Sequence, residues 1–282
     1  MHQNKLLIGV VAPGSRIDSA IVDKVADLAS RLYPDQTPEI VYHPQCFLSS
    51  GHFAGDDAQR TAAFLEIAND ERFDALWFAR GGYGSCRIAE DVMAGITDRA
   101  RRKRYLGYSD AGSLLAGLYA RGFTRLAHAP MPADILRPGG EAAVARALGY
   151  LMGQSEDAIE PSVSTDTKTA AFNITILSHV LGTPLQPDLT GHVLMLEEVS
   201  EHMYRIDRAM FHITGNPGIR RVAGIMLGRC SQIPRNEPDF AQTEEDVVRH
   251  WCARSGIPYL GRADIGHDID NKIVPFGRPL SD

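Results

Sequence analysis

Runs of apolar residues alternate with amphipathic segments through the first half of the chain. Residues 6–11 form a continuous apolar run, and Ile21, Val25, Leu28 and Leu32 then recur at the spacing of one helix face. The same alternation predicts strands over 39–42, 75–79, 105–108 and 126–129, and helices over 56–69, 85–93 and 110–121. It indicates an α/β fold of Rossmann-like form, with a mostly parallel sheet, helices on both faces and ligands bound beyond the strands' carboxyl ends.

The pattern fades between residues 130 and 169, where prolines and the polar run 162–167 predict a linker. A second patterned region follows. It predicts strands over 193–196 and 222–227, and helices over 174–181, 202–213 and 243–253. We therefore expect an N-terminal domain over 1–135, a linker over 136–168 and a smaller C-terminal α/β domain over 169–282.

Composition narrows the class of protein. The chain has 282 residues, 44% of them hydrophobic and 23% charged, so it is long enough to bury a sizeable core. A net charge of −6 disfavours a primary nucleic-acid partner, because phosphate backbones attract basic surfaces. The one basic run, 101–104, is interpreted as a solvated strand entry rather than an anion patch.

The cysteines and the N-terminal apolar run bear on location and cofactors. Cys46, Cys86, Cys230 and Cys252 are scattered without a CxxC pair, so neither a zinc site nor a disulfide framework is indicated. The first apolar run has six residues, too few for a signal sequence or a membrane span. We expect a cytoplasmic protein without a metal, a cofactor or a membrane partner.

The segment 106–112 is the most informative one for chemistry. Ser109 stands where a predicted strand ends and a helix begins, with Gly107 two residues before it and Ala111 two after it. A turn this tight exposes a hydroxyl above the sheet edge, as in a nucleophile elbow, although Ala111 departs from the GxSxG pattern. From spacing alone, a helix cap formed by Ser109 or Asp110 explains the pattern as well.

A glycine-rich turn, Arg80-Gly-Gly-Tyr-Gly84, follows a neighbouring predicted strand. Glycines at such a place let backbone N–H groups approach a ligand, which suits an oxyanion hole or a phosphate cradle. The turn matches neither GxGxxG nor GxxxxGK[ST], so the dinucleotide and P-loop interpretations lack their defining residues. A purely structural turn remains the alternative.

A serine nucleophile needs a base and an acid that orients the base. Two of the ten histidines stand out: His128 at a predicted strand end, and His267 directly after Gly266. The residues alone do not separate them. Glu197 and Glu198 follow an apolar strand, and because successive strand residues point to opposite faces, one is expected to face a cleft and the other to be solvated.

Taken together, these residues resemble the serine L,D-carboxypeptidases of the murein-tetrapeptide-carboxypeptidase type, peptidase family S66, which includes microcin-immunity hydrolases. The matching segments span the chain in the family's order: 11–15, 54–57 with Arg60, 74–85, 107–110, 181–184, 194–198, 204–208, and Gly266-His267 with Pro275 and Gly277. The resemblance implies a second domain with a barrel-like sheet, and a homodimer. It departs at 170–175 and at the C-terminal end, where many relatives continue further.

The resemblance also implies roles. It makes Ser109 the nucleophile, His267 the base, Glu197 the acid that orients it, and the backbone N–H groups of Gly82 and Asp110 the oxyanion hole. It makes His128 structural and prefers Glu197 to Glu198.

A carboxypeptidase must in addition hold a free carboxylate. Arg80, Gly81 and Tyr83 are the candidate substrate-binding residues, with Arg80 as the cation, although a structural role for Arg80 is an open alternative.

The expected activity is removal of the terminal D-alanine from murein tetrapeptides in peptidoglycan recycling, through an acyl-enzyme. One alternative is an immunity-type amidase that acts on microcin-like acyl-sulfamoyl nucleotides or other peptide-like amides. A second alternative is a two-domain protein that binds a small anion at 80–84 without chemistry.

Overall fold

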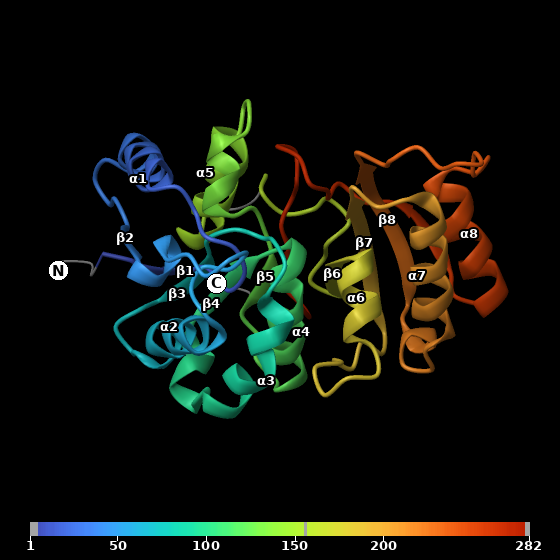
Figure 1. Ribbon diagram of the computed structural model, residues 1–282, viewed down its shortest axis with the longest axis horizontal. Helices are drawn as coiled ribbons and strands as arrows, with labels where there is room; N and C mark the ends of the chain where they lie inside the picture. The colour runs from blue at the N-terminus through green and yellow to red at the C-terminus, as the bar shows by residue number, and fades with distance from the viewer. Residues whose placement is uncertain (1–4, 155–156, 280–282) are drawn as a thin grey trace.

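The computed structural model describes residues 5–154 and 157–279 and contains two sheets that lie side by side (Figure 1). The first sheet has the order β10-β5-β4-β3-β1-β2. Its strands are β1 (Leu7–Val11), β2 (Glu39–Tyr42), β3 (Ala75–Phe78), β4 (Arg104–Gly107), β5 (Leu126–His128) and β10 (Val274–Pro275). The first five run parallel, and β10 pairs antiparallel with β5. The end of the chain thus returns to the sheet with which the chain began.

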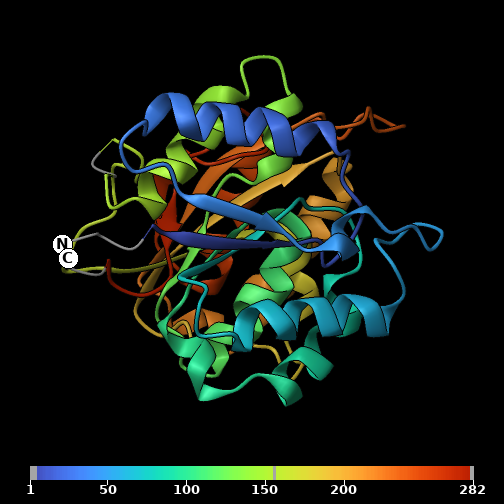
Figure 2. The same ribbon diagram turned by 90° about the vertical axis from the view of Figure 1, so that its left-hand side faces the viewer.

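Helices cover both faces of the first sheet, as Figures 1 and 2 show. α1 (Ala20–Leu32) and α5 (Glu141–Leu151) lie on one face, and α2 (Asp57–Asn69), α3 (Ser85–Gly95) and α4 (Gly112–Ala120) lie on the other. β1 and β3 are almost fully buried, which is why they form continuous apolar runs in the sequence. The predicted α/β class, with a mostly parallel sheet between helices, is confirmed.

The second sheet is smaller and wholly parallel, in the order β6-β7-β8-β9. It consists of β6 (Lys168–Asn173), β7 (His192–Val199), β8 (Gly224–Ser231) and β9 (Tyr259–Arg262). Leu194 and Leu196 pack into the same core as α6 (Ile174–Val180), α7 (Met203–Gly215) and α8 (Glu244–Ser255). Met195 points to the opposite face, where Ile265 and Val274 of the last segment cover it.

One continuous apolar core joins the two sheets. It includes residues of α2, α3 and α4 beside the first sheet and residues of β6, α6 and α7 in the second unit. The ring of Phe172 in β6 packs edge-to-face against the ring of Phe276, which directly follows β10, and the ring centroids are 5.1 Å apart. This shared packing fixes the first sheet's carboxyl edge relative to the loops of the second sheet.

Two elements were not expected from the pattern. α5 lies within the stretch predicted as a linker, and β6 begins at the last residue of that stretch and continues to Asn173, where no strand was predicted. In both elements many buried positions are alanines, whose small side chains give a weak apolar periodicity. Short 3₁₀ helices complete the fold at Pro44–Phe47, Asp98–Arg102, Ser109–Ala111, Pro132–Leu136 and Ile219–Arg221. None of the helices in the described ranges is both long and apolar enough to cross a membrane.

Candidate active site

Ser109 lies two residues after the end of β4, at the first position of the 3₁₀ helix Ser109–Ala111, and it has an unusual backbone conformation. Its φ is 61°, in the left-handed region that residues other than glycine seldom adopt. The side chain is half-buried, and among the described residues its hydroxyl makes no hydrogen bond. The hydroxyl therefore does not cap a helix. This strained strand-to-helix turn is the arrangement expected of a nucleophile elbow.

The glycine turn lies directly beside Ser109. A Cβ atom on Gly81 would lie 2.8 Å from the Ser109 Oγ, so only glycine leaves room for the hydroxyl there. Gly82 has a φ of 94°, which again favours glycine. The close approach of turn and hydroxyl is a feature that a purely structural turn would not need.

Two buried charged groups hold the turn in place. The Asp110 carboxylate accepts a hydrogen bond of 2.7 Å from the Ser85 N–H, so it joins the elbow to the start of α3. Its burial raises the pKa of Asp110. Arg60 is buried on the other side, where it donates to the carbonyls of Gly84, at 2.8 Å, and Pro13, and pairs with Asp57. The cap predicted for Asp110 thus exists, but it caps the neighbouring helix α3.

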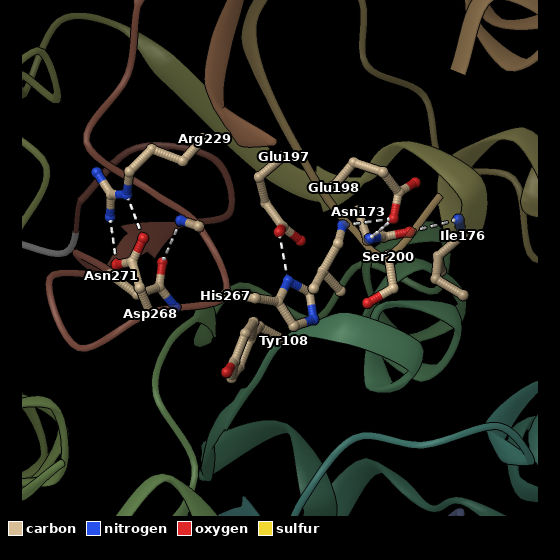
Figure 3. Close-up of polar contacts among 12 residues, drawn as sticks. Tyr108, Asn173, Ile176, Glu197, Glu198, Ser200, Arg229, His267, Asp268 and Asn271 are labelled. Atoms are coloured by element: carbon tan, nitrogen blue, oxygen red, sulfur yellow. Dashed lines mark hydrogen bonds and ion pairs between the residues drawn. The ribbon is translucent and has the colours of Figure 1, made fainter. Parts of the chain in front are cut away.

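His267 faces the same cavity as Ser109 and is paired with Glu197 (Figure 3). The cavity has a volume of about 400 Å³ and is lined by Ser109, His267, Arg80, Gly81 and Gly82. The His267 Nδ1 lies 2.5 Å from the Glu197 Oε2, and Glu197 is fully buried. The His267 Nε2 has no partner in the described part of the chain, so it is free to accept a proton.

The electrostatics of this pair suit a base. Burial lowers the pKa of His267, but the charge of Glu197 and its hydrogen bond outweigh burial, so the net pKa lies above the ordinary value. The Ser109 hydroxyl and the His267 Nε2 are not hydrogen-bonded to each other. Catalytic hydrogen bonds are often long in the absence of substrate and tighten when it binds.

Sequence reasoning missed a group that braces His267 from the N-terminal side. Arg137 donates to the His267 carbonyl at 2.6 Å and to the Asp134 carboxylate at 2.9 Å. The Tyr108 hydroxyl donates to the same carboxylate at 2.9 Å, and the Tyr108 ring lies 4.8 Å from the His267 ring. Arg137 lies in the stretch predicted as a linker, where no motif marked it.

The segment around His267 is also held from the second sheet. Arg229 of β8 pairs with Asp268 (Figure 3), and it also pairs with Asp264 at 2.5 Å, so it holds the chain before and after His267. The Asn271 Oδ1 accepts a hydrogen bond from the Gly266 N–H at 3.1 Å. His267 is therefore held by contacts from both parts of the fold, although its own segment has little regular structure.

Glu198 corrects one expectation. It is buried, only 2% exposed, and not solvated as strand alternation predicted. It accepts hydrogen bonds from the Asn173 side chain at 2.6 Å and from the Thr175 N–H at 2.9 Å, at the start of α6. Strand alternation holds, but both faces of β7 are covered: Glu198 shares the face of Leu196, against the start of α6, whereas Glu197 shares the face of Met195.

The structure also distinguishes the two histidines that the residues alone left open. His128 is buried in β5 with its Nε2 3.2 Å from the Asn271 Oδ1. Burial lowers its pKa to about 4, so its ring is neutral near pH 7. His267, in contrast, lines the cavity with an unpaired nitrogen.

The candidate substrate-binding residues are only partly brought together. Arg80 lines the cavity and donates, at 3.2 Å each, to the carbonyls of Gly81 and Arg16. Within the described ranges it has no carboxylate partner, so its charge is available to a ligand. Tyr83 does not line the cavity; it is 54% exposed and lies against the rings of His52 and Phe53.

In the described part of the chain, no group of three or more His, Cys, Asp or Glu side chains could hold a metal ion. What the site does contain is a strained serine, a histidine with a free nitrogen, a buried carboxylate on the other nitrogen, and a glycine turn. Such a set can carry out nucleophilic acyl transfer.

Comparisons with known sequences agree with this chemistry. The family model of the LD-carboxypeptidase N-terminal domain matches residues 8–129, and the family model of the C-terminal domain matches residues 168–281. A Synechocystis protein named as a carboxypeptidase is 31% identical over 85% of this chain and 79% of its own length. The murein tetrapeptide carboxypeptidase of Pseudomonas aeruginosa is 24% identical over 80% of this chain and 78% of its own length.

Solved structures share the fold. The muramoyltetrapeptide carboxypeptidase from Oxalobacter formigenes superposes with a TM-score of 0.79 and 22% identity, covering 96% of this chain and 92% of that one. The microcin C7 self immunity protein MccF superposes with a TM-score of 0.79 and 14% identity, covering 98% and 92%. The fold alone does not distinguish these two kinds of relative.

Proposed function

Because the chain belongs to the LD-carboxypeptidase family and is a serine-type carboxypeptidase, we propose that it hydrolyses the amide bond before the terminal D-alanine of murein tetrapeptides. The observation that carries the proposal is the pair of His267 and Glu197: the His267 Nε2 has no partner among the described residues, and His267 and Ser109 line the same cavity. This pair supports Ser109, Glu197 and His267 as the catalytic residues.

The mechanism follows from these positions. The Ser109 Oγ attacks the amide carbonyl while the His267 Nε2 takes its proton, and Glu197 stabilises the imidazolium that forms. The proton then passes to the leaving amine of D-alanine, and a tripeptide acyl-enzyme remains. Water, activated by the same histidine, hydrolyses it.

Backbone N–H groups of Gly82 and Asp110 are proposed to stabilise the oxyanion. Gly82 lines the cavity, and Asp110 follows Ser109 at the start of a 3₁₀ turn that leads into α4. Each such donor contributes about 3 kcal/mol to transition-state stabilisation where it has been measured.

Arg80 is proposed to hold the free carboxylate of the substrate. It lines the cavity beside Ser109, and its guanidinium is bound only to backbone carbonyls among the described residues. Arg137 lines the same cavity, but its charge is already paired with Asp134. A murein tetrapeptide ends in a free carboxylate, which this unpaired charge can bind.

The cellular part of the proposal is a role in peptidoglycan recycling in the cytoplasm, as a homodimer. The four cysteines are unpaired, as is usual in a reducing compartment. Cell fractionation and sedimentation of the purified protein test these two points separately.

The activity is tested by incubating the purified protein with murein tetrapeptide and, separately, with a processed microcin analogue. Mass spectrometry should detect release of D-alanine from the first. Ser109→Ala should abolish that release, and Cys86→Ser, an exposed position outside the cavity, serves as the control. Cleavage of the microcin analogue alone would favour the immunity-type amidase, and unchanged release by Ser109→Ala would exclude Ser109 as the nucleophile.

A further inference from the structure

A second hollow lies at the opposite edge of the first sheet, where β1, β3, β4 and β5 begin. It has a volume of about 360 Å³. Its lining includes five cationic side chains: Arg99, Arg102, Lys103, Arg104 and Arg125. We call it the basic hollow. Since β4 starts at this hollow and ends just before Ser109, the two cavities lie at opposite ends of the same strands.

Some of the charged side chains that line the basic hollow already have hydrogen-bond or ion-pair partners. Arg104 donates to the Leu151 carbonyl at 2.6 Å, and Arg99 lies 3.9 Å from Glu71. Asp74, the other acidic group in the lining, accepts a hydrogen bond of 2.8 Å from the Leu7 N–H. These contacts hold the walls together and leave part of the positive charge unpaired.

The exposed residues Arg102 and Arg125 belong to the unpaired part. Within the described ranges, neither guanidinium takes part in a hydrogen bond or an ion pair. They lie on segments that lead into adjacent strands, β4 and β5, and line one hollow. Two free guanidinium groups facing one space match the planar, multidentate geometry by which arginine binds oxyanions.

Lys103 is the observation that points most directly to a ligand. It was expected in a solvated run, yet it is only 2% exposed. Its ammonium has no hydrogen-bond acceptor and no carboxylate within 4 Å among the described residues. Burial lowers the pKa of Lys103, while Asp70, Glu71 and Asp74 act on it only from a distance. A buried ammonium without a partner is unfavourable, so an anion in the hollow would supply what the chain does not.

We propose that the basic hollow binds a dianionic phosphoryl group, held by Lys103, Arg102 and Arg125. Three unpaired cations exceed the one charge of a carboxylate and suit a phosphate or diphosphate with several acceptor oxygens. The volume of the hollow leaves space for more than a single phosphate. The site is separate from the catalytic cavity and does not depend on the proposed function.

The probes are inorganic phosphate, inorganic pyrophosphate and a nucleoside diphosphate, each titrated calorimetrically into the full-length protein at constant ionic strength. We expect one equivalent of each probe to bind saturably, and the probe whose size best fits the hollow to bind most tightly. Arg125→Gln and Arg102→Gln should each weaken this binding at least about tenfold. Arg235→Gln, at an exposed arginine that does not line the hollow, is the matched control and should bind as the parent does.

Further variants locate the ligand. Lys103→Met tests the buried ammonium, and if that variant does not fold, the two exposed arginines still decide the matter. Arg80→Gln removes the unpaired cation of the catalytic cavity and should leave pyrophosphate binding unchanged. The proposal is overturned if none of the three probes binds saturably, or if binding survives Arg125→Gln and is lost in Arg80→Gln.

Discussion

Replacing Glu197 by glutamine tests the core of the proposed mechanism. The carboxylate is fully buried, and one of its oxygens lies 2.5 Å from the His267 Nδ1. Glutamine keeps the size of the side chain but removes the charge, and its amide can donate where the carboxylate accepted. The imidazolium formed during catalysis then has no counter-charge, and the ring is no longer held in the tautomer that leaves Nε2 unprotonated.

The magnitude of the effect can be bounded. Neutralising the equivalent acid in a serine protease lowers kcat by about 10⁴-fold, or ~5.5 kcal/mol of transition-state stabilisation. The pH profile should change as well. Glu197 is the main group that raises the pKa of His267 against the effect of burial, with a smaller contribution from the charge of Glu198, so the pKa falls in Glu197→Gln. Since the neutral imidazole is the active form, the acid limb of kcat/KM should move to lower pH.

The assay is D-alanine release from murein tetrapeptide, measured as kcat/KM across pH. Glu198→Gln is the matched control, because Glu198 is also buried and adjacent but bonds to Asn173 and backbone N–H groups. We expect Glu198→Gln to lose about 1–3 kcal/mol of stability and to keep most of its rate per folded molecule. If Glu197→Gln kept its rate within tenfold, or if its acid limb moved to higher pH, the assignment of Glu197 would be wrong.

Three further substitutions extend the test. Arg137→Gln should move the acid limb of kcat/KM to higher pH, because the Arg137 charge lowers the pKa of His267. This shift is opposite to that expected for Glu197→Gln. If the acid limb did not move, the effect of Arg137 on His267 would be refuted. Gly81→Ala places a Cβ 2.8 Å from the Ser109 Oγ and should lower kcat by about a hundredfold with little change in Tm. Arg60→Met leaves two buried carbonyls without a donor and should lower the free energy of unfolding by about 2 kcal/mol in denaturant titrations.

The arrangement of the site explains why these substitutions should differ in kind. Ser109 and the glycine turn belong to the carboxyl edge of the first sheet, whereas Glu197 is supplied by β7 of the second sheet. His267 lies on the segment that returns from the second sheet to the first. Substitutions at Arg137 or Glu197 therefore change contacts with His267, between the two sheets. Gly81→Ala changes a contact with Ser109 within the carboxyl edge of the first sheet.

Local features of the chain were readable from its sequence. The alternation of apolar runs and helical spacing predicted the first sheet, because side chains buried on both faces of a parallel strand leave a continuous apolar run. The turn at Ser109 was predicted from small residues at fixed offsets, and its φ of 61° agrees with the strain such a turn implies. The fold class follows from these short-range patterns.

Contacts between distant segments were decided only by the tertiary structure. Nothing local marks Arg137, whose role depends on the His267 carbonyl 130 residues away. The burial of Glu198 depends on the start of α6, which covers that face of β7, and that of Lys103 depends on how the beginnings of four strands meet. The pattern along the chain indicates the strands of the first sheet that are buried on both faces, and the residue types that can do chemistry, since both depend on neighbours along the chain. Which charges end up paired, buried or free depends on neighbours in space, and the tertiary structure alone decided that.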